Sequence, residues 1–357
     1  MLDADFDFAD RIYEAAVLPE FWPDLLCDMA QRTTGGSAIM FASSADDVRF
    51  VASSEQYGKD ATEFFAQHPD NERTRRLLAA RHPGFLTDFD VFSFDERESL
   101  PIFRDFFLPR GYGDGAATAI PMPTGEMVIV HLEGPYKREP FDRGKVAWLD
   151  SIRPHLARSS FISARLAFER ARTAVDTLSG IGLAACAVTQ AGTVLVANPA
   201  FVAEAGFWTT RGGNRIALLD RRADRLLGDA LSIVAAGKGV RSLPLAPEGE
   251  MPAVMHVVPV RRAAHDLFGQ ASAILVLTKA SDAPTRATPL LQALFDLSPV
   301  EATIAARIAA GQTAEQIARA DDKSVDTVRN QLKNVLDKTG CRRQVDLARL
   351  LAQLVFG

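Results

Sequence analysis

The spacing of apolar residues in the first part of the chain predicts a mixed region of helices and antiparallel strands. Residues 5–17 and 21–32 carry apolar side chains every three or four positions, as amphipathic helices do. Short runs of β-branched and other apolar residues predict strands at 37–42, 48–53, 116–120 and 127–132. The last two are joined by a turn with proline and glycine, which suits an antiparallel pair. We therefore predict an α+β domain over residues 1–153.

Two clusters inside this region bear on chemistry. Phe103, Phe106 and Phe107 share one face of a predicted helix, and they form either a core stripe or the wall of a ligand pocket. The second cluster is an acidic run, which we interpret as a solvated loop rather than a pair of catalytic carboxylates. Its members are Asp88, Asp90, Asp95 and Glu96.

From residue 142 onward the pattern predicts a long helix with an interruption. Pro154 lacks a backbone N–H and clashes one turn back, so we expect a kink or break near Arg153. Beyond it, apolar residues step alternately by four and three positions, which is the period of a coiled-coil seam. The seam comprises Ala157, Phe161, Ala164, Phe168, Ala171, Val175 and Leu178. We predict a connecting helix over 154–179 that self-associates in a homodimer, the alternative being a helix packed on its own domain.

Residues 180–280 predict a second α+β domain. Two strands, a short helix from Asn198-Pro199 and a longer helix over 224–236 are followed by three strands without a long crossover. The strands are expected at 183–188, 193–197, 240–245, 254–260 and 272–277. This order implies an antiparallel sheet with helices on one side. It resembles a PAS sensor domain, in which the strand Val194-Leu-Val-Ala-Asn198 matches the strand that closes on Asn.

A linker rich in helix-breaking residues, 281–296, separates this domain from a C-terminal part that contains only helical patterns. Ser298 and Glu301 form a capping box that opens the first helix, which Gly311 ends. Further helices are predicted from Thr313, from Ser324 and over 344–354. We predict an all-α four-helix domain over residues 297–357.

The third of these helices has two faces. Its apolar face carries Val325, Val328, Leu332, Val335 and Leu336. Its other face carries cationic and amide groups, which is typical of a helix-turn-helix whose second helix enters the DNA major groove. Arg329 and Asn330 are predicted to pair with base edges. The predicted phosphate contacts are Lys323, Ser324, Thr327, Lys333, Lys338, Arg342 and Arg343. A solvated helical face is the alternative.

The motifs of this segment resemble those of the LuxR-type DNA-binding domain. They are Leu297-Ser-Pro-Val-Glu301, Ala309-Ala-Gly311, Gln316-Ile-Ala318, Ser324-Val-Asp-Thr-Val328 and Asp337-Lys-Thr-Gly340. The chain departs from the common pattern at Val300, Asn330 and Gln344, which concerns the base preference and not the fold. The resemblance implies that Arg329, Asn330 and Lys333 contact DNA and that the fourth helix, with Leu347 and Leu351, dimerises. Residues 1–153 more loosely resemble the GAF-like sensor regions of such regulators.

Composition and charge exclude several classes. With 357 residues, 47% hydrophobic and 24% charged, the chain is an ordinary multidomain globular protein. A net charge of -5 excludes a uniformly basic nucleic-acid coat but allows a local cationic face. Cys27, Cys186 and Cys341 lie too far apart to indicate a zinc site or a disulfide framework. No stretch suits a membrane span and the acidic start is unlike a secretory signal, so we expect a cytoplasmic protein.

No pattern predicts catalysis, because the six histidines lack metal-ligand spacing and there is no phosphate loop or nucleophile elbow. Our leading hypothesis is a transcription regulator without enzymatic activity, cofactor or metal, whose two sensor domains control the helix-turn-helix. Its partners are double-stranded DNA and a second copy of the chain; a small-molecule ligand, the operator and the sign of regulation are left open. One alternative is a ligand-binding sensor or scaffold whose C-terminal helices bind proteins, and another is a σ-factor-like promoter reader.

Overall fold

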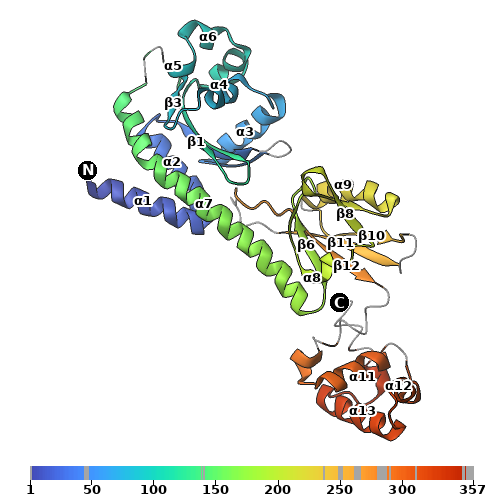
Figure 1. The fold of residues 1–357 in the computed structure, drawn as a ribbon. Helices are drawn as coiled ribbons and strands as arrows, with labels where there is room; N and C mark the ends of the chain where they lie inside the picture. The colour runs from blue at the N-terminus through green and yellow to red at the C-terminus, as the bar shows by residue number, and fades with distance from the viewer. Residues whose placement is uncertain are drawn as a thin grey trace. The chain divides into compact units, whose positions relative to one another are not determined.

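The computed structural model describes residues 2–43, 48–137, 139, 141–235, 238–247, 252–260, 267–279, 288, 291–309, 312–347 and 350. The chain divides into two compact units (Figure 1). Unit 1 comprises Met1–Phe168 with Arg261–Gly269, and unit 2 comprises Glu169–Val260 with Gln270–Gly357. Within the described ranges, none of the helices combines the length and apolar character that a membrane crossing requires.

Unit 1 is built on a five-stranded antiparallel sheet with the order β2-β1-β5-β4-β3. The strands are β1 (Ser37–Ser43), β2 (Val48–Ala52), β3 (Leu86–Thr87), β4 (Asp114–Pro121) and β5 (Met127–Gly134). Alternate residues of β1 face opposite sides, so Met40 packs in one core and Phe41 in another. Both faces of this sheet are therefore buried, which explains the nearly continuous apolar runs of β1 and β5.

Helices cover the two faces of this sheet. On the first face lie α1 (Leu2–Val17), α2 (Trp22–Arg32) and the start of α7 (Arg143–Gly180), joined in the core by Leu267 and Phe268. On the second face lie α3 (Glu55–Gln67) and α4 (Glu72–Ala80). Shorter segments complete the unit: η1 (Pro19–Phe21), α5 (Asp88–Val91), α6 (Phe94–Ser99), the π-helix η2 (Ile102–Phe107) and η3 (Leu108–Arg110). The result is a three-layer α/β/α arrangement.

The helix α7 continues through Pro154, so the break that the sequence analysis allowed there does not occur. One uninterrupted helix runs from Arg143 to Gly180 (Figure 1). Proline removes one hydrogen bond and crowds the preceding turn, a cost that tertiary packing can offset. On either side of Pro154, the side chains of Leu149, Ile152 and Leu156 are at most 2% exposed. Burial of these side chains therefore holds the helix together across the proline.

Unit 2 contains a second five-stranded antiparallel sheet, ordered β10-β11-β12-β6-β7. Its strands are β6 (Ala184–Val188), β7 (Val194–Ala197), β10 (Arg241–Leu245), β11 (Ala253–Pro259) and β12 (Ala273–Lys279). The helices α8 (Pro199–Val202) and α9 (Arg221–Ala235) pack on one face. The strands and helices lie where the sequence predicted them. The hairpin of β8 (Trp208–Arg211), η4 (Gly212–Asn214) and β9 (Arg215–Leu218) was not predicted, because its strands are only four residues long and show no clear alternation.

The predicted coiled-coil seam divides between two cores of its own chain. Ala157 and Ala164 pack against the core of unit 1. Ala171 (7% exposed) and Val175 (0%) are buried against the second sheet, whose Ala185 and Val276 they join. The prediction that Ala171 and Val175 lie in a dimer seam is therefore wrong, because the chain itself covers them. Phe161 remains 41% exposed.

The C-terminal helices are α11 (Pro299–Ala309), α12 (Ala314–Ala320) and α13 (Val325–Thr339). Their common core includes Leu291, which the sequence analysis assigned to the linker. The packed domain thus begins before residue 297, because the apolar side chain of Leu291 fills its core. Residues 344–347 begin the predicted fourth helix; the rest of that helix, apart from residue 350, lies outside the described residues, as do Gly311 and Leu351.

Candidate nucleic-acid interface and a second candidate site

Side-chain caps fix the starts of all three C-terminal helices, as the sequence predicted. The Ser298 hydroxyl accepts the Glu301 N–H (3.3 Å), and the Glu301 carboxylate accepts the Ser298 N–H (2.8 Å). Thr313 and Gln316 form the same reciprocal box at α12. The Ser324 hydroxyl accepts the Thr327 N–H at the start of α13 (3.1 Å). These caps satisfy backbone donors that would otherwise lack partners.

The helix α13 has one buried and one exposed face, also as predicted. Val328, Leu332 and Val335 are at most 4% exposed and lie in the core shared with α11 and α12. Arg329, Asn330 and Lys333 are exposed on the other face. The apolar residues hold the helix on the domain, so the cationic and amide groups are presented outward.

Two exposed side chains extend this polar face. Arg329 is paired through Nη2 with Glu315 Oε1 of α12 at 2.7 Å, an exposed contact that orients the guanidinium without burying it. Asn334 is exposed four residues after Asn330, and the sequence analysis did not name it. The helical spacing of the two amides was the signal that could have found it.

The predicted phosphate contact Lys338 has partners within the domain. Its ammonium donates to Glu301 Oε2 (2.8 Å) and to the carbonyl oxygen of Asp296 (3.0 Å). The ion pair with Lys338 and the N–H of Ser298 lower the pKa of Glu301 below its ordinary value. Lys338 thereby joins the end of α13 to the start of α11, which is a structural role.

Of the remaining predicted DNA contacts, some are engaged within the domain and others are exposed. Lys323 lies 3.5 Å from Asp321, which also binds Arg307 at 2.6 Å. The hydroxyls of Ser324 and Thr327 are hydrogen bonded to each other at 2.7 Å but remain exposed. Arg342 and Arg343 are exposed just after the left-handed Gly340 that ends α13. By contrast, Leu347 is fully buried in the domain core, so the prediction that it is a dimer contact is wrong.

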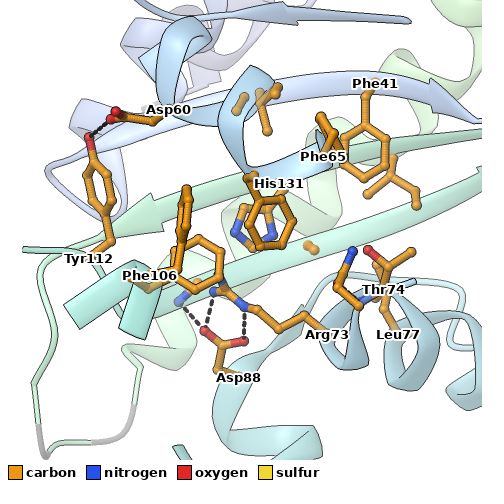
Figure 2. Close-up of a pocket in the computed structure, with 18 of the residues that line it drawn as sticks. Phe41, Asp60, Phe65, Arg73, Thr74, Leu77, Asp88, Phe106, Tyr112 and His131 are labelled. Carbon is orange, nitrogen blue, oxygen red and sulfur yellow. Dashed lines mark hydrogen bonds and ion pairs between the residues drawn. The ribbon is translucent and has the colours of Figure 1, made fainter. Parts of the chain in front are cut away.

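A second candidate site is a cavity in unit 1, between the second face of the sheet and the helices α3, α4 and η2 (Figure 2). The volume of the cavity is about 70 Å³. Its walls are mainly aromatic and aliphatic: Ile39, Phe41, Tyr57, Ala61, Phe64, Phe65, Leu77, Phe106, Phe107, Tyr112, Ala117 and Ile129. Of the three phenylalanines that the sequence singled out, Phe103 is core, whereas Phe106 and Phe107 line the cavity.

A buried ionic cluster forms one part of the wall. Arg73 binds Asp88 through Nε (3.1 Å) and Nη2 (2.6 Å), and Glu133 through Nη1 (2.7 Å). His131 Nε2 lies 3.0 Å from Glu133 Oε2. Asp88 is 6% exposed, so the interpretation of residues 88–96 as a solvated loop is wrong at this position. No sequence signal linked Arg73, Asp88 and the His131–Glu133 pair, because three separate elements (α4, α5 and β5) carry them.

Backbone donors and a glycine complete the cluster. The Gly113 N–H donates to Glu133 (3.1 Å) and the Gly115 N–H to Asp88 (2.6 Å). A Cβ at Gly115 would lie 2.3 Å from Arg73 Nη2, so only glycine fits there. Burial by itself would raise the pKa of Glu133, but the charge of Arg73 and the hydrogen bond from His131 lower it to about 2.

The three capped helices, with one amphipathic helix presenting cations, define the C-terminal part as a helix-turn-helix domain. Residues 296–351 match the family described as bacterial regulatory proteins, luxR family. This segment is therefore a luxR-family helix-turn-helix domain, which confirms the resemblance seen in its motifs. The rest of the chain lies outside that match. A comparison with curated proteins gave no match.

Several solved structures are distantly similar. SdiA from Escherichia coli aligns with 97% of this chain and 90% of its own, at 13% identity and a TM-score of 0.29. The N-acylhomoserine lactone dependent LuxR family factor CepR2 from Burkholderia cenocepacia covers 46% of this chain and 99% of its own (13% identity, TM-score 0.35). The VqsR LBD domain from Pseudomonas aeruginosa covers 45% and 97% (16%, 0.35). Likenesses of this size do not define the fold or the ligand of this chain.

The low pKa of Glu133 predicts a specific loss of stability in acid. Above about pH 4.5 the residue is ionised in both the folded and unfolded states, so its full contribution is present; as the pH falls towards 2, only the unfolded state takes up the proton. The expected loss is on the order of 3 kcal/mol across that window. Urea unfolding of the full chain at pH 7 to 2.5, followed by tryptophan fluorescence, measures it.

Glu133→Gln is the test variant. Glu14→Gln, on the exposed side of α1, is the matched control. The free energy of unfolding of Glu133→Gln should be lower than wild type at pH 7 and should converge with it in acid. A constant difference between wild type and Glu133→Gln at all pH values would contradict the assignment.

Proposed function

We propose that this chain is a DNA-binding transcription regulator in which the N-terminal α+β domains control the C-terminal helix-turn-helix. The observation that carries the proposal is the exposed polar face of α13, where Arg329, Asn330 and Lys333 project from a helix anchored by a buried apolar face. Guanidinium and carboxamide groups match the acceptor and donor patterns of guanine and adenine in the major groove. Lys333 is placed to neutralise phosphate.

The auxiliary contacts follow from the same geometry. The exposed hydroxyls of Ser324 and Thr327 at the N-terminus of α13 are positioned to donate to a phosphate, which the helix dipole also favours. Arg342, Arg343 and Lys323 add exposed positive charge beside the helix. Lys338 is excluded from the strongest contacts because Glu301 neutralises it.

Control by the N-terminal domains rests on population shift. A signal changes DNA binding only if it favours one arrangement of the sensor domains over another. Side chains of the continuous helix α7 are buried in the core of the first sheet and in the core of the second. A change in the packing of either sheet therefore acts on this one helix. We assign residues 1–153 to a GAF-like and residues 180–280 to a PAS-like sensor, supported by the two five-stranded antiparallel sheets, and we infer a cytoplasmic protein.

The alternative is a sensor or scaffold whose C-terminal helices bind proteins. In that case the exposed face of α13 would be a protein interface, and neutralising its cations would not change any affinity for duplex DNA. Binding to DNA at several salt concentrations therefore discriminates between the two functions.

We predict that Arg329→Ala weakens DNA binding about 5- to 100-fold, because a bidentate base contact is lost. Lys333→Gln should weaken binding uniformly and reduce the slope of log affinity against log salt by about one unit. Fluorescence anisotropy of duplexes selected from genome-wide binding sites, measured with the full chain at several salt concentrations, tests both variants.

Lys338→Gln is the charge-matched control, since it also removes one cation from α13. It should alter the salt dependence less than Lys333→Gln, because its ammonium is engaged by Glu301. Circular dichroism would check that each variant is folded. Unchanged DNA binding by both Arg329→Ala and Lys333→Gln would refute the proposed interface, and equal salt slopes for the two lysine variants would refute the structural role of Lys338.

We further propose that the chain is a homodimer through the uncovered part of α7. Phe161 and Ile162 are adjacent on α7 and each 41% exposed, and Phe168 is half-buried one heptad after Phe161. Changing Phe161 and Phe168 to glutamate should shift the chain towards monomer in sedimentation-velocity experiments. Glu substitution at exposed Ala66 of α3 is the control; a dimer that survives the double change would place the interface elsewhere.

A further inference from the structure

We propose that the cavity of unit 1 binds a small, uncharged, planar aromatic molecule that carries one hydrogen-bonding group, which the hydroxyl of Tyr57 contacts. This inference builds on the proposed function, since it names the class of signal that the N-terminal domain would sense. It rests on the walls, the polar groups and the charges of the cavity.

The walls favour a flat ring. The sheet side presents Ile39, Ile129 and the small residues Gly115 and Ala117, and the helical side presents the rings of α3 and η2 (Figure 2). Aromatic pairs prefer offset or edge-to-face contacts, and the wall rings already pack this way, as in the Phe64–Phe106 pair at 5.1 Å. The free space of about 70 Å³ is roughly half that of an engineered cavity of about 150 Å³ that holds benzene, so it excludes a long chain, and a bound ring requires small shifts of the wall side chains.

Tyr57 provides the polar contact. Its side chain is 6% exposed and, among the described residues, its hydroxyl has no hydrogen-bond partner, although it lines the cavity. Burial, together with the charge of Glu133, raises the pKa of Tyr57 well above its ordinary value, so the hydroxyl keeps its proton. Because the wall around it is mainly apolar, this hydroxyl gains a hydrogen bond when a ligand presents a hydroxyl, carbonyl or ring nitrogen.

The carboxylate oxygens at and beside the cavity wall already have hydrogen-bond partners, which disfavours an ionic ligand. Both oxygens of Asp88 accept from Arg73, and Asp88 Oδ2 also accepts the Gly115 N–H. Both oxygens of Glu133 are engaged as well, by Gly113, Arg73 and His131. The carboxylate of Asp60 accepts from Gln56 (3.1 Å) and Tyr112 (3.4 Å). An anionic ligand would lose its hydration and find Arg73 already engaged by two carboxylates, and a cationic ligand would have to displace an existing hydrogen-bond partner.

The local backbone gives independent support. Phe106 and Phe107 reach the cavity from a π-helix, Ile102–Phe107, which is a rare conformation that occurs frequently at functional sites. Arg73 stacks on Phe107 at 4.4 Å, so the ionic cluster also fixes the position of one cavity wall. The π-helix and the ionic cluster thus together position two of the rings in the cavity wall.

Calorimetric titration of the full chain, without DNA, tests the proposal with four probes. These are p-cresol (neutral aromatic), benzoate (anion), benzylammonium (cation) and octanoyl glycerol (neutral acyl chain). We expect p-cresol to bind at least tenfold more tightly than the other three. Equal or tighter binding of benzoate, benzylammonium or octanoyl glycerol, or no binding of p-cresol, would overturn the proposal.

Variants locate the bound probe. Ala61→Leu fills the cavity from α3 and should abolish p-cresol binding, whereas Ala66→Leu on the exposed side of the same helix should not change it. Tyr57→Phe should weaken binding about two- to tenfold through the lost hydrogen bond, whereas Tyr136→Phe, which lies outside the cavity, should not. Wild-type affinity in Ala61→Leu would place the site elsewhere. Because these titrations contain no DNA, failure of the proposed regulator function would appear separately, in the anisotropy measurements.

Discussion

The packing of α7 is the constraint on which most of this structure depends, because one helix supplies buried surface to two successive sheets. Its first half buries Leu149 and Leu156 against the first sheet, and its last turns bury Ala171 and Val175 against the second. A sheet face left uncovered would expose a row of apolar side chains to water, so each sheet requires this helix. The same requirement explains why α7 continues through Pro154.

The two sheets have the same strand order but differ in the groups that are buried beside them. Counted within each sheet, both place the first strand between the second and the last, and every neighbouring pair is antiparallel. In unit 1, Gly115 leaves room for the Arg73 guanidinium against the sheet, where Arg73 is buried with two carboxylates. Such a cluster adds little stability relative to apolar side chains of the same volume, but removal of one partner is costly, so the cluster fixes the position of the side chains around it. The shape of the cavity wall therefore depends on buried charges.

In the helix-turn-helix, the charges that build the domain are distinct from those that remain available. Lys338 and Arg307 are engaged by Glu301 and Asp321, which join the helices to one another. Lys333 projects from α13 without an ion pair among the described residues, and Arg329 holds only an exposed contact with Glu315. The surface proposed to meet DNA is thus defined by what the internal ion pairs leave exposed. Net charge could not have shown this, since the whole chain is acidic.

Local order was determined by the sequence itself. Caps such as Ser298, Thr313 and Ser324, the two faces of α13 and most strands could be predicted, because each depends on residues within a few positions of one another. Only the tertiary structure decided which partner a side chain takes. The heptad of α7 packs on two domains, Lys338 pairs across the domain, and Arg73 of α4 meets Asp88 of α5 and Glu133 of β5. The physical reason is that burial and ion pairing depend on distance in space, which periodicity along a chain does not encode.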